Sequence, residues 1–206
     1  MFIPVNDFLQ IGIVILSYLM GGIPFGYLVG KWVKGADIRK LGSGNIGATN
    51  VARVIGKKWG VVVFILDFLK GVLPLFLAFL IKGCSPLIFL LVALGCVAGH
   101  NWSVFLKFKG GKGVSTSLGV ITGLSFKFPQ LIIPLSLALG GWIVIFCLFR
   151  YVSLASLISA AVFCLFCIIS SLPWEIKGFS LFILLFIIIR HTKNISNLLK
   201  NKELKV

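Results

Sequence analysis

The sequence predicts an all-α integral membrane protein, a seven-transmembrane-helix bundle with its N-terminus outside and its C-terminus in the cytoplasm. Three observations support this fold class: the composition, the number of apolar segments, and the distribution of Lys and Arg. Of 206 residues, 59% are hydrophobic and 12% are charged, whereas about a quarter of a soluble domain is charged. Because a mean hydropathy of +1.10 leaves too little polar surface to cover a globule, a soluble enzyme or extracellular module is excluded.

Seven apolar segments are candidate membrane spans, because the hydrocarbon core needs about 20 apolar residues per helix. In chain order they cover residues 8–32, 60–81, 86–106, 114–126, 131–149, 152–172 and 178–191. The first is predicted to be a retained span and not a signal peptide, since no Lys or Arg precedes Lys31. Segment 114–126 reaches only about 20 Å as a helix, so a re-entrant segment is the alternative there.

The basic residues favour seven spans. Twenty Lys and Arg face five Asp and Glu, giving a net charge of +15, a balance that suggests either nucleic acid or membrane orientation. With seven spans only Lys82, Lys127 and Lys177 lie outside and Lys70 lies within a span, which leaves sixteen of the twenty inside. A re-entrant segment 114–126 weakens that split to twelve against seven. The positive-inside rule therefore supports seven spans, and no nucleic-acid partner is expected.

The chain is predicted to form one membrane-embedded domain, residues 1–206. It shows no internal repeat and no low-complexity linker. Its five cysteines form no even disulfide framework, and we interpret them as small hydrophobic residues. Two His and five scattered acids offer no clustered ligand set, so we expect no metal site and no cofactor.

Four polar clusters gather on the predicted cytoplasmic side, and the first covers residues 41–53. Its glycines permit backbone amides to point together at an anion. Ser43, Asn45, Thr49 and Asn50 add neutral donors, and Arg53 adds a planar fork suited to phosphate or carboxylate. An ordinary glycine-rich turn before a helix is the alternative, and the absence of a following Gly-Lys-Ser/Thr excludes a Walker A loop.

The second cluster, residues 99–113, ends in Gly-Gly-Lys112-Gly113 immediately before an apolar segment. Such a turn at a helix N-terminus brings free amides, the positive end of the helix dipole and an ammonium together, so phosphate is the expected ligand. Anchoring at the headgroup level is the alternative for its lysines. His100 is interpreted as an interfacial or locally hydrogen-bonded residue.

The third and fourth clusters are residues 150–156 and 190–203. Ser153 and Ser156 are three apart and share a helix face, as do His191 and Asn194. Serines in membrane helices often donate to the carbonyl of the preceding turn, and this structural role is the alternative for Ser153 and Ser156. A His aligned with an Asn at the end of the last span favours a ligand contact.

Asp67 and Lys70 lie within segment 60–81, where ionisable residues are functional candidates by default. Their spacing of three allows an ion pair on one helix face. We expect a structural pair that braces the first cluster.

The motifs GSGNIGATNVAR, GHNWSVFLKFKGGKGV, RYVSLAS and RHTKNISNLLKNKE, in this order and separated by apolar spans, resemble those of the bacterial acyl-phosphate:glycerol-3-phosphate acyltransferases (PlsY). The resemblance covers nearly the whole chain. It implies a seven-helix enzyme of the bacterial plasma (inner) membrane, with its active site facing the cytoplasm. Such an enzyme makes lysophosphatidic acid in phospholipid biosynthesis from acyl phosphate and glycerol 3-phosphate, and does not use acyl-CoA or acyl carrier protein.

The resemblance also implies roles for individual residues. Lys112, His191 and Ser43 are the expected catalytic residues. Acyl phosphate is expected to bind Ser43, Gly44, Asn45, Gly47, Thr49, Lys112 and Gly113. Glycerol 3-phosphate is expected to bind Arg53, Lys112, Ser153, His191 and Asn194. Structural support is expected from Glu203, and for Asp67 the same expectation rests on its spacing from Lys70 and not on the resemblance. The sequence departs from the family pattern at Ile46, Asn197 and Asn201, where Pro, Arg and Gly are common.

The expected chemistry needs few catalytic groups, because acyl phosphate is a mixed anhydride with a good leaving group. Alignment of the hydroxyl and cationic stabilisation of developing charge can suffice, without an acyl-enzyme. His191 as a general base is the alternative to a purely binding His191. Expected partners are the two substrates and membrane lipids, with the enzyme that forms acyl phosphate as a further candidate. A transporter of anionic phosphorylated solutes is the rival function, although such proteins usually show inverted repeats.

Overall fold

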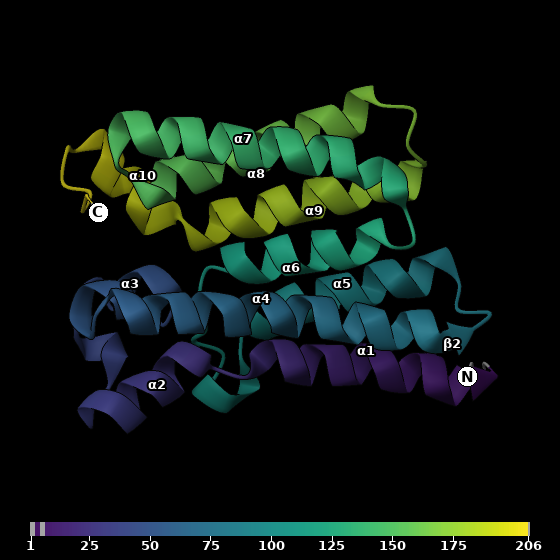
Figure 1. Ribbon diagram of the computed structural model, residues 1–206, viewed down its shortest axis with the longest axis horizontal. Coiled ribbons are helices and arrows are strands. Elements are labelled where there is room, and N and C mark those ends of the chain that lie inside the picture. Colours follow the sequence, from purple (N-terminus) through teal and green to yellow (C-terminus); the bar gives the residue numbers. More distant parts are fainter. Residues whose placement is uncertain (1–2, 5–6, 206) are drawn as a thin grey trace. The chain divides into compact units, whose positions relative to one another are not determined.

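The computed structural model describes residues 3–4 and 7–205, with side chains from residue 7 onward. The chain divides into two compact units, residues 1–127 and residues 128–206 (Figure 1). Each unit is described separately below. The sequence predicts that residues 1–206 form one domain. Because this depends on how the two units associate, it stays a prediction.

Unit 1 is built almost entirely of helices. These are α1 (Asp7–Gly22), α2 (Phe25–Lys34), α3 (Ala48–Val54), α4 (Lys57–Leu80), α5 (Pro86–Asn101) and α6 (Val114–Ser125), with 3₁₀ turns η1 (Ile38–Lys40) and η2 (Val104–Leu106). A two-residue parallel pairing joins β1 (Ile3–Pro4) to β2 (Ile81–Lys82), which follows α4. In Figure 1, α2 and α3 lie at the opposite end of unit 1 from β2.

Glycines allow two helix pairs of unit 1 to approach closely. A Cβ at Gly71 of α4 would lie 2.6 Å from the Thr116 carbonyl of α6, and one at Gly119 would collide with the Phe68 carbonyl. Gly99 of α5 meets α1 in the same way at the Tyr18 carbonyl. Small residues at such crossings let backbones pack directly against each other, as is common between membrane helices.

The predicted first span, 8–32, is divided in the structure between α1 and α2. The break falls at Ile23 and Pro24, since proline has no N–H to donate and restricts the residue before it. Pro24 is the residue immediately before α2, and its carbonyl accepts a hydrogen bond from the Leu28 N–H in the first turn of that helix. The Lys70 ammonium donates to the Ile23 carbonyl at 2.7 Å, so a polar group is satisfied at the break.

Unit 2 contains η3 (Pro129–Leu131), α7 (Ile132–Phe149), α8 (Val152–Ile169), α9 (Trp174–Arg190) and α10 (Thr192–Leu199). Arg150 adopts a left-handed φ of 62° after α7, and this tight turn returns the chain along α8. α9 then packs against α8. The short α10 was not among the predicted helices, because it is polar and lies beyond the last apolar segment.

Five helices of the described chain are long and apolar enough to cross a membrane. They cover Asp7–Lys34, Lys57–Leu80, Pro86–Leu106, Pro129–Phe149 and Val152–Ile169. Of the other two predicted spans, α6 has 12 residues and α9 has 17. The all-helical class is therefore confirmed, while seven crossings and the orientation of the termini stay predictions.

Candidate functional site

Asn50 organises the first polar cluster, which lies between η1 and the first turn of α3. Its side chain is 1% exposed. Its Oδ1 accepts from the Ser43 N–H at 2.8 Å, and its Nδ2 donates to the carbonyls of Asn45 (2.8 Å), Leu41 (3.0 Å) and Ile38 (3.3 Å). One buried amide thus holds the loop at both ends.

The backbone amides of this loop are used within the loop. The Ser43 N–H donates to Asn50, the Gly44 N–H to the Leu41 carbonyl, and the Gly47 N–H to Asn45 Oδ1 at 2.8 Å. Each of these three N–H groups therefore has a partner within the loop, and binding of an anion by the loop stays a prediction. Asn50 was expected to be a ligand donor, and the structure instead uses it to hold the loop.

The predicted ligand residues of the first cluster lie along its accessible side. Ser43 and Gly44 are exposed at the turn, and Asn45, Gly47 and Thr49 are half-buried. Arg53 is exposed in the last turn of α3. The side-chain groups offered to an anion here are thus the Ser43 and Thr49 hydroxyls, the Asn45 amide and the Arg53 guanidinium.

An ion pair between Asp37 and Arg39 lies just before the first cluster in the chain. Arg39 donates to both carboxylate oxygens of Asp37, with 2.7 Å between Nη2 and Oδ2. This hydrogen bonding holds the pKa of Asp37 at about 2, below its usual value near 3.8. The Arg39 guanidinium also lies 4.9 Å from the centre of the Tyr27 ring, on α2.

The second cluster places Lys112 at the start of α6. Lys112 is half-buried, and Gly113 is the buried N-cap, with a left-handed φ of 77° that favours glycine. No side chain caps the first turn of α6 at Gly113. Lys107 and Lys109 are exposed. The structure therefore brings an ammonium to the positive end of a helix, as the sequence predicts.

One apolar core underlies both clusters of unit 1. It contains Ile38, Ile46 and Val51 from the first cluster, Val29 from α2, Val63 from α4, and Leu106 from the second cluster. Ile46, which stands where the family commonly has Pro, is 3% exposed. Burial of these side chains fixes the two loops on the same end of unit 1.

Asp67 and Lys70 form the predicted ion pair, at 2.8 Å. The side chains are 3% exposed, and Asp67 Oδ1 also lies 3.7 Å from Nδ1 of His100. From the sequence, this brace is expected at the first cluster. Its contacts with His100 and the Ile23 carbonyl place it instead beneath the second cluster and at the α1–α2 break.

Glu203 joins the third and fourth clusters in unit 2. Its Oε1 accepts from the hydroxyl of Ser153 at 2.7 Å and from Nδ2 of Asn194 at 2.6 Å. The chain reaches this position through Asn201, which adopts a left-handed φ of 53°. Asn tolerates that conformation better than most residues.

His191 is 1% exposed at the junction of α9 and α10. Its Nδ1 lies 2.8 Å from the Ile187 carbonyl. Because a carbonyl only accepts, Nδ1 carries a proton, and Nε2 is the basic nitrogen of the neutral ring. Ser156 donates to the Val152 carbonyl at 2.7 Å and accepts from Trp142, so its hydroxyl serves packing between α7 and α8.

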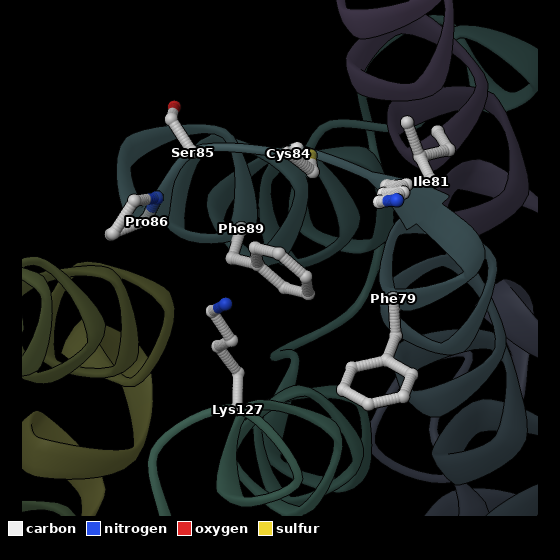
Figure 2. Close-up of a pocket in the computed structure, with 9 residues that line it drawn as sticks. Phe79, Ile81, Cys84, Ser85, Pro86, Phe89 and Lys127 are labelled. Carbon is white, nitrogen blue, oxygen red and sulfur yellow. The ribbon is translucent and has the colours of Figure 1, made fainter. Parts of the chain in front are cut away.

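A pocket of about 560 Å³ lies at the other end of unit 1, around β2 (Figure 2). Phe79, Phe89 and Lys127 line it, and the Lys127 ammonium lies 5.6 Å from the centre of the Phe89 ring. None of the predicted site residues lines this pocket. It is therefore separate from the two glycine-rich loops.

Comparison with known proteins assigns a family to this arrangement. A family profile described as glycerol-3-phosphate acyltransferase matches residues 11–201. Glycerol-3-phosphate acyltransferase 2 of Thermotoga maritima is 42% identical over 197 residues, covering 93% of this chain and 94% of that protein. The glycerol-3-phosphate acyltransferase of Aquifex aeolicus is 43% identical over 191 residues, covering 93% and 96%.

Solved structures show the same fold. The crystal structure of PlsY, an integral membrane glycerol 3-phosphate acyltransferase, in its glycerol 3-phosphate form matches with a TM-score of 0.87 and 41% identity, covering 96% of this chain and 95% of that one. Its lysophosphatidic acid form matches with a TM-score of 0.84.

The helical spans, with basic and hydroxyl side chains at glycine-rich loops, are consistent with a multi-pass membrane enzyme. The similarity to known acyltransferases argues against the alternative of a transporter. The chain belongs to the glycerol-3-phosphate acyltransferase family.

Proposed function

We propose that this protein transfers the acyl group of an acyl phosphate to the 1-hydroxyl of glycerol 3-phosphate, giving lysophosphatidic acid and phosphate for phospholipid synthesis. Family membership supports the acyltransferase activity and glycerol 3-phosphate as acceptor. The observation that carries the proposal is Lys112 at the N-terminus of α6, over the same apolar core as the Ser43 loop. An ammonium and a helix dipole at that place stabilise phosphate groups.

The proposed step is direct. The 1-hydroxyl oxygen attacks the acyl carbonyl carbon, the bond between that carbon and the phosphate oxygen breaks, and the leaving phosphate takes the hydroxyl proton. Lys112 stabilises the negative charge that grows on the leaving group, and Ser43, Asn45 and Thr49 hold the acyl phosphate, while Gly44, Gly47 and Gly113 shape the loops on which it binds. This step needs no acyl-enzyme.

Glycerol 3-phosphate is assigned to the remaining polar groups. Arg53 and Lys112 supply positive charge for its phosphate. Ser153, His191 and Asn194 are proposed to orient it, and Glu203 supports Ser153 and Asn194 from the tail. The hydrogen bonds of Glu203 to Ser153 and Asn194 favour that supporting role.

We also propose seven crossings with the N-terminus outside, so that the active site faces the cytoplasm of the bacterial inner membrane. The excess of Lys and Arg in the predicted inside loops supports this orientation. A C-terminal fusion to green fluorescent protein should fluoresce, while a C-terminal alkaline phosphatase fusion should be inactive. The opposite pair of results contradicts the orientation.

The activity is tested with purified protein in detergent, palmitoyl phosphate and glycerol 3-phosphate, scored for lysophosphatidic acid and released phosphate. We expect equal amounts of both products, and none with palmitoyl-CoA. Lys112→Ala should abolish product, whereas Lys109→Ala, an exposed lysine in the same segment, should retain it. Folded wild-type protein without product contradicts the proposal. The enzyme that supplies acyl phosphate is a candidate partner, to be tested by co-purification.

A further inference from the structure

The ring of His100 packs directly beneath the turn that carries Lys112. The Gly111 N–H donates to the His100 carbonyl at 2.9 Å. A Cβ at Gly111 would overlap the ring, and its three nearest atoms would be Nε2, Cε1 and Cδ2 of His100. His100 is 3% exposed. The imidazole therefore fills the space below the backbone immediately before Lys112.

Asp67 holds the other edge of this ring. Its Oδ1 lies 3.7 Å from Nδ1 of His100 and 2.8 Å from the Lys70 ammonium. Lys70 is anchored in turn to the Ile23 carbonyl at the α1–α2 break. A continuous series of buried contacts thus runs from the α1–α2 break through α4 to the turn that carries Lys112.

Buried charged groups are costly in a membrane protein, and they persist where they fix a geometry that function needs. The turn has a glycine at position 111, where an added Cβ would meet the ring, so the ring and the backbone share a surface there without an intervening side chain. Movement or loss of the ring would therefore be transmitted directly to the residue that follows Gly111.

We infer that His100 is a positioning residue, which acts through Gly111 to set the location of the Lys112 ammonium, while Asp67 sets the orientation of the ring. This inference rests on the proposed function, because it assigns the support of Lys112 at the substrate phosphates. His100 itself contacts neither substrate.

The expected cost is large because a catalytic group displaced by about 1 Å can lose about a hundredfold in rate. We expect His100→Ala and His100→Asn to lower kcat/KM for palmitoyl phosphate about a hundredfold, with a lower kcat and a higher KM. His100→Asn provides a second, polar variant if the alanine variant does not fold. Size-exclusion chromatography and thermal melting establish that each variant is folded.

The two glycines of the turn provide a matched pair for the decisive test. The nearest obstacles to a Cβ at Gly111 are His100 ring atoms, whereas those at Gly110 are the backbone carbonyl groups of His100 and Asn101. Neither glycine has a positive φ, so the cost of alanine at each position comes from the contacts of the added Cβ and not from its backbone conformation. Truncating His100 should remove the steric obstacle to Gly111→Ala and leave the backbone obstacle to Gly110→Ala in place.

We therefore expect Gly111→Ala to lower kcat/KM in the wild-type protein and to add little loss in the His100→Ala background. Gly110→Ala should cost the same factor in both backgrounds. The melting temperatures of the same variants should show the same non-additivity, which gives a readout independent of activity. A merely structural contact produces this coupling in melting temperature alone, whereas the positioning role also requires it in kcat/KM of variants that are folded at the assay temperature.

The outcomes separate this inference from the proposed function. An inactive wild-type protein overturns the function. An active wild type with unchanged kcat/KM in folded His100→Ala and His100→Asn overturns only the positioning role. Equal costs of Gly111→Ala in both backgrounds overturn it as well, because they show that the ring does not set the turn.

Discussion

The Ser153 hydroxyl donates a 2.7 Å hydrogen bond to Oε1 of Glu203, and it joins the first turn of α8 to the tail fifty residues later. The same oxygen accepts from Asn194 in α10. One carboxylate oxygen therefore aligns two of the side chains that we assign to glycerol 3-phosphate. A bond to a charged acceptor contributes more than a neutral one, so this contact is a strong constraint on the tail.

Glu203→Ala should destabilise unit 2 and weaken binding of glycerol 3-phosphate. Loss of the shared acceptor leaves two donors unsatisfied, which costs about 1–3 kcal/mol. Glu203→Gln retains an acceptor oxygen and should stay close to wild type in both properties. Thermal melting and the KM for glycerol 3-phosphate measure the two effects. Lys202→Ala, exposed in the same tail, serves as the control, and a Glu203→Ala variant with unchanged KM would contradict the assignment.

Asn50→Ala should disorder the first loop. The substitution removes four hydrogen bonds from a buried site, and each buried group left unpaired costs about 1–3 kcal/mol. Asn50→Asp should fail as well, since a carboxylate cannot donate to the three carbonyls. We expect a lower melting temperature and a higher KM for palmitoyl phosphate. Lys58→Ala, exposed in the first turn of α4, is the control. Wild-type kinetics in Asn50→Asp would show that the donors are dispensable.

The sequence predicts the helical class, most span positions and the Asp67–Lys70 pair, because apolar segment length and residue spacing report directly on burial and on a shared helix face. It fails at Ile23–Pro24, where one long apolar run conceals a helix break. It also fails at Asn50, because composition alone cannot tell a side chain that binds a ligand from one that closes its own loop. Polarity at a loop was the only available signal, and both roles require it.

The importance of His100 was missed for a different reason. The sequence separation between Asp67, His100 and Gly111 gives no indication of contact, since that contact arises from the packing of α4 against α5 and the return of the chain after η2. The Gly110-Gly111 pair before Lys112 was a sequence signal that another part of the chain approaches the backbone closely there. It identifies the tight turn but not the ring beneath it.

Arg39→Gln should raise the pKa of Asp37 from about 2 toward its usual value near 3.8. The folded-state pKa lies below the unfolded one, so the stability from this carboxylate is present above the unfolded pKa and is lost as pH falls toward 2. Between pH 5 and 8 it should therefore contribute no pH dependence. Carbon NMR of labelled aspartate in detergent micelles follows the titration, with Asp37→Asn to identify the signal. An unchanged pKa in Arg39→Gln would contradict the cause assigned here.

Gly71→Ala should destabilise unit 1 by separating α4 from α6. The added Cβ would meet the Thr116 carbonyl and the Val120 nitrogen at 2.6 and 2.9 Å, and backbone atoms cannot rotate away. Overpacking of this kind costs about 1–3 kcal/mol. Gly12→Ala in α1 is the matched control, because nothing lies within 4 Å of its added Cβ. Thermal melting should separate the two variants, and equal melting temperatures would contradict the close crossing.

His191→Ala should raise the KM for glycerol 3-phosphate about tenfold or more while retaining most of kcat at saturation, because we assign this residue to binding and the proton to the leaving phosphate. The Nδ1 contact with Ile187 leaves Nε2 as the nitrogen of the neutral ring that can accept a proton. A general base at Nε2 would therefore give another result: a collapse of kcat with an unchanged KM, and loss of the acidic limb of the pH–rate profile. Steady-state kinetics from pH 5 to 9 on His191→Ala, with Asn194→Ala as the binding comparison, distinguish the two. If kcat falls alone in His191→Ala while Asn194→Ala changes only KM, His191 is the base and direct proton transfer to phosphate is wrong.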